Sequence, residues 1–316
     1  MNNNSSVIAV LCSHLCADNC RPFEQSEWSK LAKTLREHDL EPKDIPDLSD
    51  DDYKGFLGYG KDEIERIKRL LDRAGSLGFE LEKLSSFGIN VITRADKDYP
   101  RQLKTKLRGG PPMFYYAGEL ELLNRRTVGF VGSRTVGEDD TSFTDKTVGK
   151  IVSRGFGVVS GGAKGIDSAS AAASLSKGGF CIEYIADSFL RRLKKSEVIS
   201  GIQENKLLIM SMAKPDAGFN VGMAMQRNKF IYAQSVTTVV VKSDYNKGGT
   251  WSGATEALNM RYCPVLCRNR SQYPGNVALI RLGAIPIDDN WDGDVDNIGS
   301  SVPDIGEQLS LFDGAN

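Results

Sequence analysis

The sequence predicts an α/β fold: an open, mostly parallel sheet with helices on both faces, preceded by a small helical N-terminal domain. From residue 89 onward, short apolar runs alternate with stretches of helical periodicity, which is typical of parallel βαβ units. Before residue 89 the periodicity is helical throughout. Because 316 residues exceed one average domain, we expect a helical domain over 1–88, a sheet domain over 89–287 and a tail over 288–316.

The N-terminal helices are predicted from the spacing of apolar residues. Ile64, Ile67, Leu70 and Leu71 lie on one stripe of a helix, and proline and aspartate clusters at 42–52 separate this helix from those before it.

The cysteines are expected to be reduced and to pack inside the protein. Cys12, Cys16 and Cys20 would share one face of an N-terminal helix, with His14 between them. A metal or iron–sulfur site is the alternative, but no fourth ligand follows at a standard spacing, so we expect no metal. The other three cysteines fall in predicted strands or beside them: Cys181, Cys263 and Cys267.

The sheet domain begins with a short strand near 88–92, and its pattern changes after residue 115. Six apolar strands are predicted over 127–132, 158–160, 181–186, 207–212, 237–242 and 264–267. Helical stretches fall between them, over 139–154, 165–176, 189–203, 220–235 and 251–260. Ligands of such sheets bind outside the carboxyl ends of the strands, so the loops that follow each strand are the candidate site.

Three of these loops have a composition that suits phosphate. They contribute, in chain order, Gly132, Ser133 and Arg134; then Ser160, Gly161, Gly162 and Lys164; and then Gly249 and Thr250. Glycine lets the backbone approach a ligand, and a helix N-terminus presents N–H groups to an anion. Neither the dinucleotide fingerprint nor the Walker lysine pattern is present, so the sequence does not favour NAD binding or ATP hydrolysis, and no cofactor is expected.

The charge distribution also favours a polyanionic ligand. The net charge is −1, but residues 101–287 hold 26 Lys and Arg against 14 Asp and Glu, a net charge of +12. Residues 288–316 hold eight acidic residues and no basic one. A basic excess of this size attracts phosphate. The alternative is a solvated surface whose balancing charge lies elsewhere in the chain.

Membrane insertion and secretion are not expected. No apolar run approaches the roughly 20 residues that cross a bilayer. The first residues lack the basic segment of a signal peptide. We therefore expect a cytoplasmic protein without a membrane partner.

The sequence resembles that of the DNA-processing protein A (DprA/Smf) family. The resemblance runs from about residue 58 to residue 287 and rests on ordered motifs. These are DYPRQL at 98–103, PPMFYYAG at 111–118, VGSR at 131–134, SGGAKGID at 160–167, RNKFI at 227–231, GNVALI at 275–280 and GA at 283–284.

The resemblance implies an extended Rossmann-like domain that binds single-stranded DNA without catalysis. It further implies a homodimer and, as in that family, a partnership with RecA recombinase. Carried over to this sequence, Arg134 would grip a phosphate, with Arg227, Asn228 and Lys229 beside the loops. Arginine suits this role because its planar fork matches phosphate oxygens. The helical domain would be of the SAM or helix-hairpin type.

Three departures from the family pattern leave the biological role open. Ala171 stands where the family usually has a histidine, Lys242 stands where an acidic residue is usual, and residues 183–200 match poorly. The role in recombination is therefore weighed against that of a paralogue in a phage-defence or toxin–antitoxin module.

The acidic tail is predicted to be disordered because it is rich in Gly, Asp and Ser. Near its end, Gln308, Leu309, Ser310, Leu311 and Phe312 resemble the pentapeptide that binds the DNA polymerase sliding clamp. Gln308 would form hydrogen bonds, and the apolar side chains would fill a pocket. The alternative is that this run packs on the protein itself.

The competing function is a nucleotide sensor or a nucleotide N-glycosidase of a related fold. Hydrolysis would need a carboxylate near the glycosidic bond, and Asp167 and Glu256 are the candidates. Asp167 is more simply a helix-start residue and Glu256 a surface charge. Trp251 is the best candidate for stacking on a base, with a place in the core as the alternative.

Overall fold

The computed structural model describes residues 1–107 and 109–298, which form two compact units. The first unit comprises Met1–Asn124 and Cys181–Phe230. The second comprises Arg125–Phe180 and the described residues from Ile231 onward. This division differs from the boundary expected near residue 88, because the N-terminal helices share a unit with four strands. The boundary from the sequence pattern stays a prediction.

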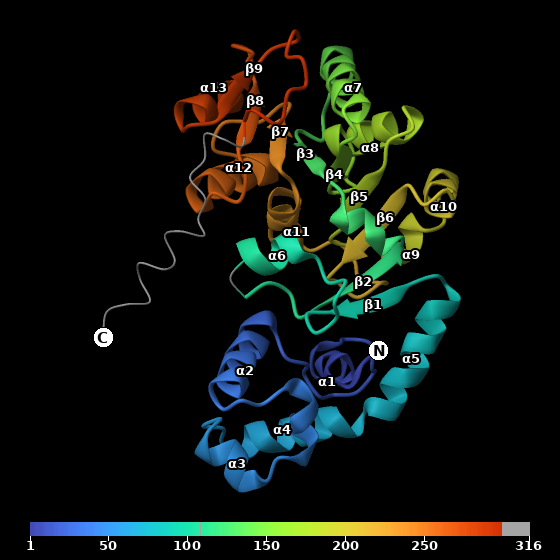
Figure 1. The fold of residues 1–316 in the computed structure, drawn as a ribbon, viewed down its shortest axis with the longest axis vertical. Coiled ribbons are helices and arrows are strands. Elements are labelled where there is room, and N and C mark those ends of the chain that lie inside the picture. The colour runs from blue at the N-terminus through green and yellow to red at the C-terminus, as the bar shows by residue number, and fades with distance from the viewer. Residues whose placement is uncertain (108, 299–316) are drawn as a thin grey trace. The chain divides into compact units, whose positions relative to one another are not determined.

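Helices form the N-terminal part of the first unit, as predicted. They are α1 (Asn3–Cys12), α2 (Gln25–Glu37), the 3-10 helix η1 (Pro42–Asp47), α3 (Asp50–Gly55), α4 (Lys61–Asp72) and α5 (Ala74–Ser86) (Figure 1). Helix α4 buries Ile64, Ile67 and Leu70, whereas Leu71 stays partly exposed. The amphipathic stripe therefore packs this helix, and α1 contacts η1, α4, β1 and β2.

The prediction that three cysteines share a helical face is wrong. Helix α1 ends at Cys12, and Ser13 is extended, with φ −76° and ψ 140°. The Arg73 side chain donates to the carbonyls of Val10 and Ser13 and so satisfies the helix end. Cys16 and Cys20 follow outside the helix. Among the described residues, no group of His, Cys, Asp or Glu is arranged to hold a metal ion.

The strands of the first unit form a mixed sheet in the order β1-β2-β6-β5. They are β1 (Asn90–Thr93), β2 (Met113–Gly118), β5 (Cys181–Tyr184) and β6 (Leu207–Ser211). The β1/β2 and β2/β6 pairs are antiparallel, and β5 and β6 are parallel. Short helices connect them: α6 (Arg101–Lys106), η2 (Leu120–Asn124), α9 (Phe189–Arg192) and α10 (Ser196–Gln203).

The single helix predicted over 189–203 is in fact two helices. Lys195 is extended, with φ −81° and ψ 133°, and it caps α10. Arg192, at the end of α9, forms a bidentate ion pair with Glu183 of β5 at 2.8 and 2.5 Å. Glu183 is only 1% exposed. Because this ion pair holds the end of α9 against β5, the helix stops there, and α10 begins as a separate helix after the extended Lys195.

The second unit contains five parallel strands in the order β4-β3-β7-β8-β9. They are β3 (Thr127–Val131), β4 (Gly157–Ser160), β7 (Thr237–Val240), β8 (Val265–Arg268) and β9 (Ile285–Ile287). Residues 285–287 were not predicted to be a strand, because the run is short and contains a proline, which is tolerated only at a sheet edge. Cys181 and Cys267 are fully buried in their strands, and Cys263 is buried just before β8.

Helices cover both faces of this parallel sheet, as predicted. They are α7 (Glu138–Ser153), α8 (Ile166–Ser176), α12 (Gly248–Met260) and α13 (Pro274–Arg281). In Figure 1, α7 and α8 lie on one side of the strands and α12 and α13 lie on the other. The chain steps from β3 to β4 in one direction and from β7 to β9 in the other, so right-handed crossovers place the helices on opposite faces. Helix α11 (Val221–Gln234) leads from the first unit into the second.

Residues 288–298, expected to belong to a disordered tail, instead pack on the second unit. Val295 is 4% exposed, and the Lys150 ammonium donates to the carbonyls of Asp289 and Trp291 at 3.0 and 2.5 Å. Among the described helices, none is both long and apolar enough to cross a membrane.

Candidate nucleic-acid interface

Three loops of the second unit meet at one edge of its sheet. They follow β3, β4 and β7, which are neighbouring parallel strands, so their carboxyl ends share that edge. The strand order reverses between β3 and β7. Open α/β sheets bind their ligands at such a switch point.

The loops after β3 and β4 contact each other through backbone. The Ile166 N–H, at the start of α8, donates to the Ser133 carbonyl at 3.3 Å. Gly165 has φ +85°, and a Cβ atom there would lie 2.2 Å from the Ser133 oxygen. A Cβ on Gly132 would lie 2.5 Å from Ile166 Cγ1. Glycine at both positions is therefore required for the two loops to approach this closely.

Lys242, at the end of the β7 segment, holds the loop after β3 in place. Its carbonyl accepts a hydrogen bond from the Ser133 N–H at 2.9 Å. Its ammonium donates to the Thr135 carbonyl and to Asp140 Oδ2, both at 3.3 Å. The lysine that departs from the family pattern is thus part of an internal network.

Asp140 is the centre of that network. It accepts hydrogen bonds from Tyr273 Oη at 2.5 Å, the Gly137 N–H at 3.1 Å and Arg268 Nη1 at 3.3 Å. Burial alone would raise the pKa of Asp140, but the bonds from Tyr273, Gly137 and Lys242 outweigh it and lower the pKa below its usual value. Burial, reinforced by the bond to Asp140, raises the pKa of Tyr273 to about 12.

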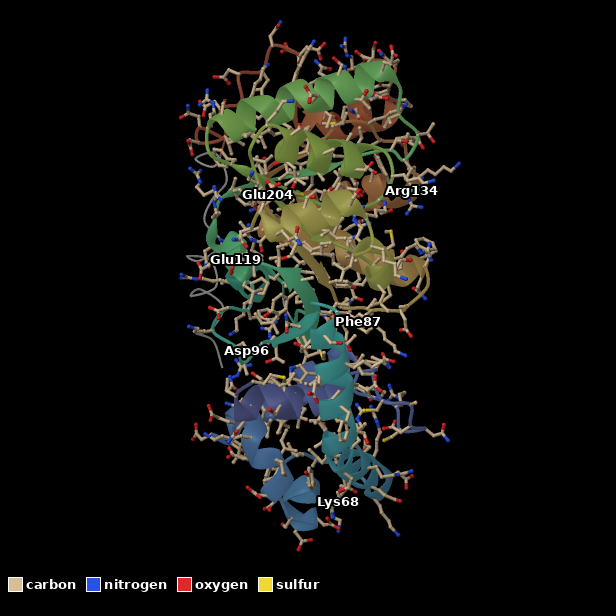
Figure 2. All side chains as sticks on the ribbon, turned by 90° about the vertical axis from the view of Figure 1, so that its right-hand side faces the viewer. Lys68, Phe87, Asp96, Glu119, Arg134 and Glu204 are labelled. Carbon is tan, nitrogen blue, oxygen red and sulfur yellow. The ribbon has the colours of Figure 1, made fainter. Side chains whose placement is uncertain are left out.

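The edge presents two basic side chains to solvent. Arg134 and Lys164 are both exposed, and Figure 2 shows Arg134 at the surface. Both precede α8, whose N-terminus carries the positive end of the helix dipole. Ser160 is different, because its hydroxyl is fully buried and has no hydrogen-bond partner among the described residues.

The remaining predicted site residues divide between the loop after β4, helix α12 and helix α11. Gly249 and Thr250 belong to the first turn of α12 rather than to a loop. Gly161 is buried and Gly162 is partly exposed, both directly after β4. Arg227 is buried and Asn228 and Lys229 are partly exposed on α11, within the first unit. A single site built from both units therefore stays a prediction. Residues 308–312, the clamp-binding pentapeptide, lie outside the described residues.

Tyr245 is a site candidate that sequence reasoning missed. It is 61% exposed in the segment after β7, and its ring packs edge-to-face on Trp251, with centroids 5.2 Å apart. Trp251 is partly exposed and so is not a core residue. The available signal was an aromatic residue between a strand end and the Gly248-Gly249 pair.

The two candidate catalytic carboxylates, Asp167 and Glu256, lie on different helices of the second unit. Asp167 is 7% exposed in the first turn of α8, and Glu256 is partly exposed on α12.

Part of the basic excess is neutralised within the second unit. Arg126 pairs with Asp296 at 2.5 Å, Arg154 with Asp292 at 3.1 Å, and Arg270 with Asp289 at 2.6 Å. Segment 288–298 thus balances the charge of arginines other than Arg134, which is exposed at the edge together with Lys164.

Comparison with known proteins agrees with the motifs. Residues 90–292 match the family described as DNA recombination-mediator protein A. DNA processing protein DprA of Bacillus subtilis is 28% identical over 200 residues, which cover 63% of this chain and 65% of that protein. DprA of Streptococcus pneumoniae is 34% identical over 109 residues, 34% of this chain and 36% of that one. The chain thus spans less than two thirds of the length of these relatives.

Two solved structures share the fold. The X-ray structure of DprA from Streptococcus pneumoniae has a TM-score of 0.68 at 20% identity and covers 90% of this chain and 94% of that one. DprA from Helicobacter pylori, in a structure described for its single-stranded DNA binding mode, has a TM-score of 0.54 at 23% identity and covers 72% and 98%. Because the family match extends over more than half of its residues, the chain belongs to the DNA recombination-mediator protein A family.

Proposed function

We propose that this protein binds single-stranded DNA without catalysis, at the edge formed by the loops after β3, β4 and β7, and acts in DNA recombination or processing. The observation that carries the proposal is the placement of Arg134 and Lys164 at the start of α8. The related Helicobacter pylori protein is described as binding single-stranded DNA, which supports the same class of ligand here.

A backbone phosphate would be bound by three features acting together. The Arg134 guanidinium offers paired donors, Lys164 adds a mobile positive charge, and the α8 N-terminus adds oriented N–H groups. The close contact between Gly165 and Ser133 keeps bulky side chains away from this point. The Lys242–Asp140 network keeps the loop that carries Arg134 in one conformation before DNA arrives, which lowers the entropy lost on binding.

Preference for a single strand would come from aromatic stacking. Bases of a single strand are free to stack on exposed rings, whereas paired bases are not. The Tyr245–Trp251 pair supplies two such rings in the segment that follows β7. We propose that Arg227, Asn228 and Lys229 of α11 complete the site from the first unit, as the family motif implies.

The test is fluorescence anisotropy with a labelled single-stranded oligonucleotide and the matching duplex, titrated across salt. We expect the wild type to prefer the single strand, because only unpaired bases reach the aromatic pair. We expect Arg134→Glu to weaken binding by at least about tenfold, since it replaces a phosphate donor with a repelling charge.

Arg281→Glu is the matched control. Arg281 is exposed in the last turn of α13, which leads into the amino end of β9, at the opposite edge of the sheet. If the two variants lose the same affinity, long-range charge explains binding and the proposed site is wrong.

We further propose that residues 308–312 tether the protein to the DNA polymerase sliding clamp. Deleting these residues is expected to abolish capture of the protein by purified clamp and to leave oligonucleotide affinity unchanged. Capture that survives the deletion would refute the tether.

A homodimer, a RecA-type recombinase as partner and a place in the cytoplasm are further proposals drawn from the family resemblance. Light scattering tests the first, and loading of recombinase onto coated single strands tests the second. If recombinase loading is absent while DNA binding is retained, the phage-defence or toxin–antitoxin role becomes the better proposal.

The competing function, nucleotide hydrolysis, is tested through Glu256→Gln and Asp167→Asn. We expect no turnover of nucleotides by the wild type. Turnover that Glu256→Gln or Asp167→Asn removes would replace the proposed function by an N-glycosidase.

A further inference from the structure

One guanidinium nitrogen of Arg94, Nη1, is buried without an acceptor among the described residues. The residue directly follows β1 in the first unit, where its backbone N–H donates to the Pro112 carbonyl at 2.9 Å. Its side chain is half-buried and lies over the Tyr99 ring, 5.7 Å from the centroid. Nη1 is buried, and among the described residues it has no hydrogen-bond partner and no carboxylate at ion-pair distance.

Other buried arginines of this protein do have acceptors. Arg73 donates to the carbonyls of Val10 and Ser13, Arg192 pairs with Glu183, and Arg268 pairs with Asp139 and Asp140. Burying a guanidinium nitrogen without an acceptor is unfavourable. Arg268 Nε also lacks a partner, but that guanidinium has two carboxylates beside it. Arg94 has no carboxylate partner among the described residues, which indicates a partner that the protein itself does not supply.

A second cation lies close to Arg94. The guanidinium faces α6, because a Cβ atom on Gly110 would lie 3.0 Å from Arg94 Nη1 and 3.7 Å from the carbonyl oxygen of Leu103. Lys104 follows Leu103 on that helix. Partial burial, and then the charge of Arg94, lower the pKa of Lys104. Two cations that repel each other, without an acidic partner for either among the described residues, form a site prepared for an anion.

The nearest acidic residue in sequence does not fill this role. Asp96 accepts hydrogen bonds from Thr93, Ser5 and Asn2 at 2.6–3.2 Å, which occupy its oxygens in holding α1 to β1. The absence of a side chain at Gly110 lets the Arg94 guanidinium pack directly against its backbone, because a Cβ there would lie 3.0 Å from Nη1.

We propose that Arg94 and Lys104 form a second phosphate-binding site, in the first unit, which takes a backbone phosphate of the bound single strand. The inference rests on the proposed function and extends it: the strand is held at two separate places rather than at the loop edge alone. An arginine fork beside a lysine is suited to a phosphate with several free oxygens.

The test is the double variant Arg94→Met/Lys104→Met, which keeps the apolar stem of Arg94 on Tyr99. In anisotropy titrations across salt we expect affinity to fall by about tenfold or more, because two charged donors are lost. We expect the slope of log affinity against log salt to become shallower by about 1.4, since each contact to a single strand contributes about 0.7. Arg36→Met/Lys61→Met is the control, because it removes one arginine and one lysine that are both exposed on other helices, α2 and α4.

A second measurement, of the melting temperature, shows whether the site also binds a phosphate that is not part of a DNA strand. Inorganic phosphate and a mononucleotide are added separately while the melting temperature is followed. We expect both to raise the melting temperature of the wild type more than that of the double variant. Without phosphate we expect Arg94→Met alone to melt no lower than the wild type, because it removes a guanidinium that has no carboxylate partner among the described residues. A clearly lower melting temperature would show that Arg94 has a structural role instead.

The outcomes separate this inference from the proposed function. If the double variant keeps the affinity and the salt slope of the wild type while Arg134→Glu loses binding, the second site is wrong and the proposed function stands. If the wild type binds no oligonucleotide, the proposed function falls. A phosphate-dependent rise in melting temperature that the double variant lacks would then assign the site to a free phosphate or nucleotide, and no rise would overturn it.

Discussion

Asp140 illustrates how single residues prepare the loop edge for an anion. It is 2% exposed, yet it stays ionised because Tyr273, Gly137, Lys242 and Arg268 all direct donors at it. The same carboxylate thereby holds the Lys242 side chain, from the segment that follows β7, against the loop after β3. The negative charge of Asp140 is neutralised by donors inside the protein, so it does not repel the proposed phosphate.

Asp140→Asn is expected to lower the free energy of unfolding by about 3 kcal/mol at pH 7, because it breaks a buried charge network. The folded-state pKa lies below the unfolded value of about 3.9, so this stabilisation is present above that value and is lost as the pH falls through the folded-state pKa. Urea denaturation at several pH values checks it.

Asp145→Asn on the same helix is the control for that measurement. Asp145 forms only a surface ion pair with Lys177, which contributes less than about 1 kcal/mol. Equal losses in the two variants would contradict a special role for Asp140.

At the scale of elements, the start of α8 decides how close two loops can come. Gly165 and Gly132 remove the side chains that would separate Ser133 from Ile166. The helix therefore begins directly beneath the loop that carries Arg134. Two glycines without a side chain of their own thus set the spacing of the proposed phosphate donors.

Gly165→Ala is expected to destabilise the second unit by about 3 kcal/mol, from the positive φ together with a backbone clash. It should also weaken oligonucleotide binding, since the loop carrying Arg134 must move. Gly155→Ala tests the φ cost alone: its φ is +82° with nothing within 4 Å, so about 1 kcal/mol and no change in binding are expected. Calorimetry and anisotropy together separate the two effects.

The sequence predicted most elements to within a few residues, because apolar runs between helical stretches are a strong signal. It failed where tertiary contacts decide. One predicted helix is in fact two, and Arg192 at the end of the first is paired with Glu183 of β5. The local sequence pattern does not reveal an ion pair between a helix and a strand. Likewise, Arg134 could be predicted as a site residue from its position after a strand. The sequence could not predict that Ser160 Oγ and Arg94 Nη1 are buried without a hydrogen-bond partner among the described residues, because this depends on the folded chain.

For the whole molecule, segment 288–298 redistributes charge. Its aspartates cover Arg126, Arg154 and Arg270, so the net charge of +12 over 101–287 overstates the charge available to DNA. We therefore expect a DNA strand to contact particular side chains, such as Arg134 and Lys164, rather than a general basic surface.

Truncation after Ile287 is expected to melt several degrees below truncation after Ile298. The shorter chain loses buried Val295, the two carbonyls that Lys150 binds and the pair between Arg268 and Asp289. Each kcal/mol lost corresponds to about 2–4 °C. The shorter chain should also bind duplex DNA more strongly at low salt, because its arginines are uncovered. Equal melting temperatures would show that the segment contributes nothing to folding.

The pairing of β3 with β7 has a consequence for synthesis of the chain. Val128 lies beside Thr237, so one edge of the apolar strand β3 waits for more than a hundred residues to be translated before its neighbour exists. At roughly 5–20 residues per second that wait is on the order of 10 s. During it the nascent chain exposes the unpaired edge of a strand that is fully buried in the folded protein, the kind of surface that aggregates or recruits chaperones. The switch point that creates the proposed binding edge therefore cannot form until β7 has been made, long after β3 and β4.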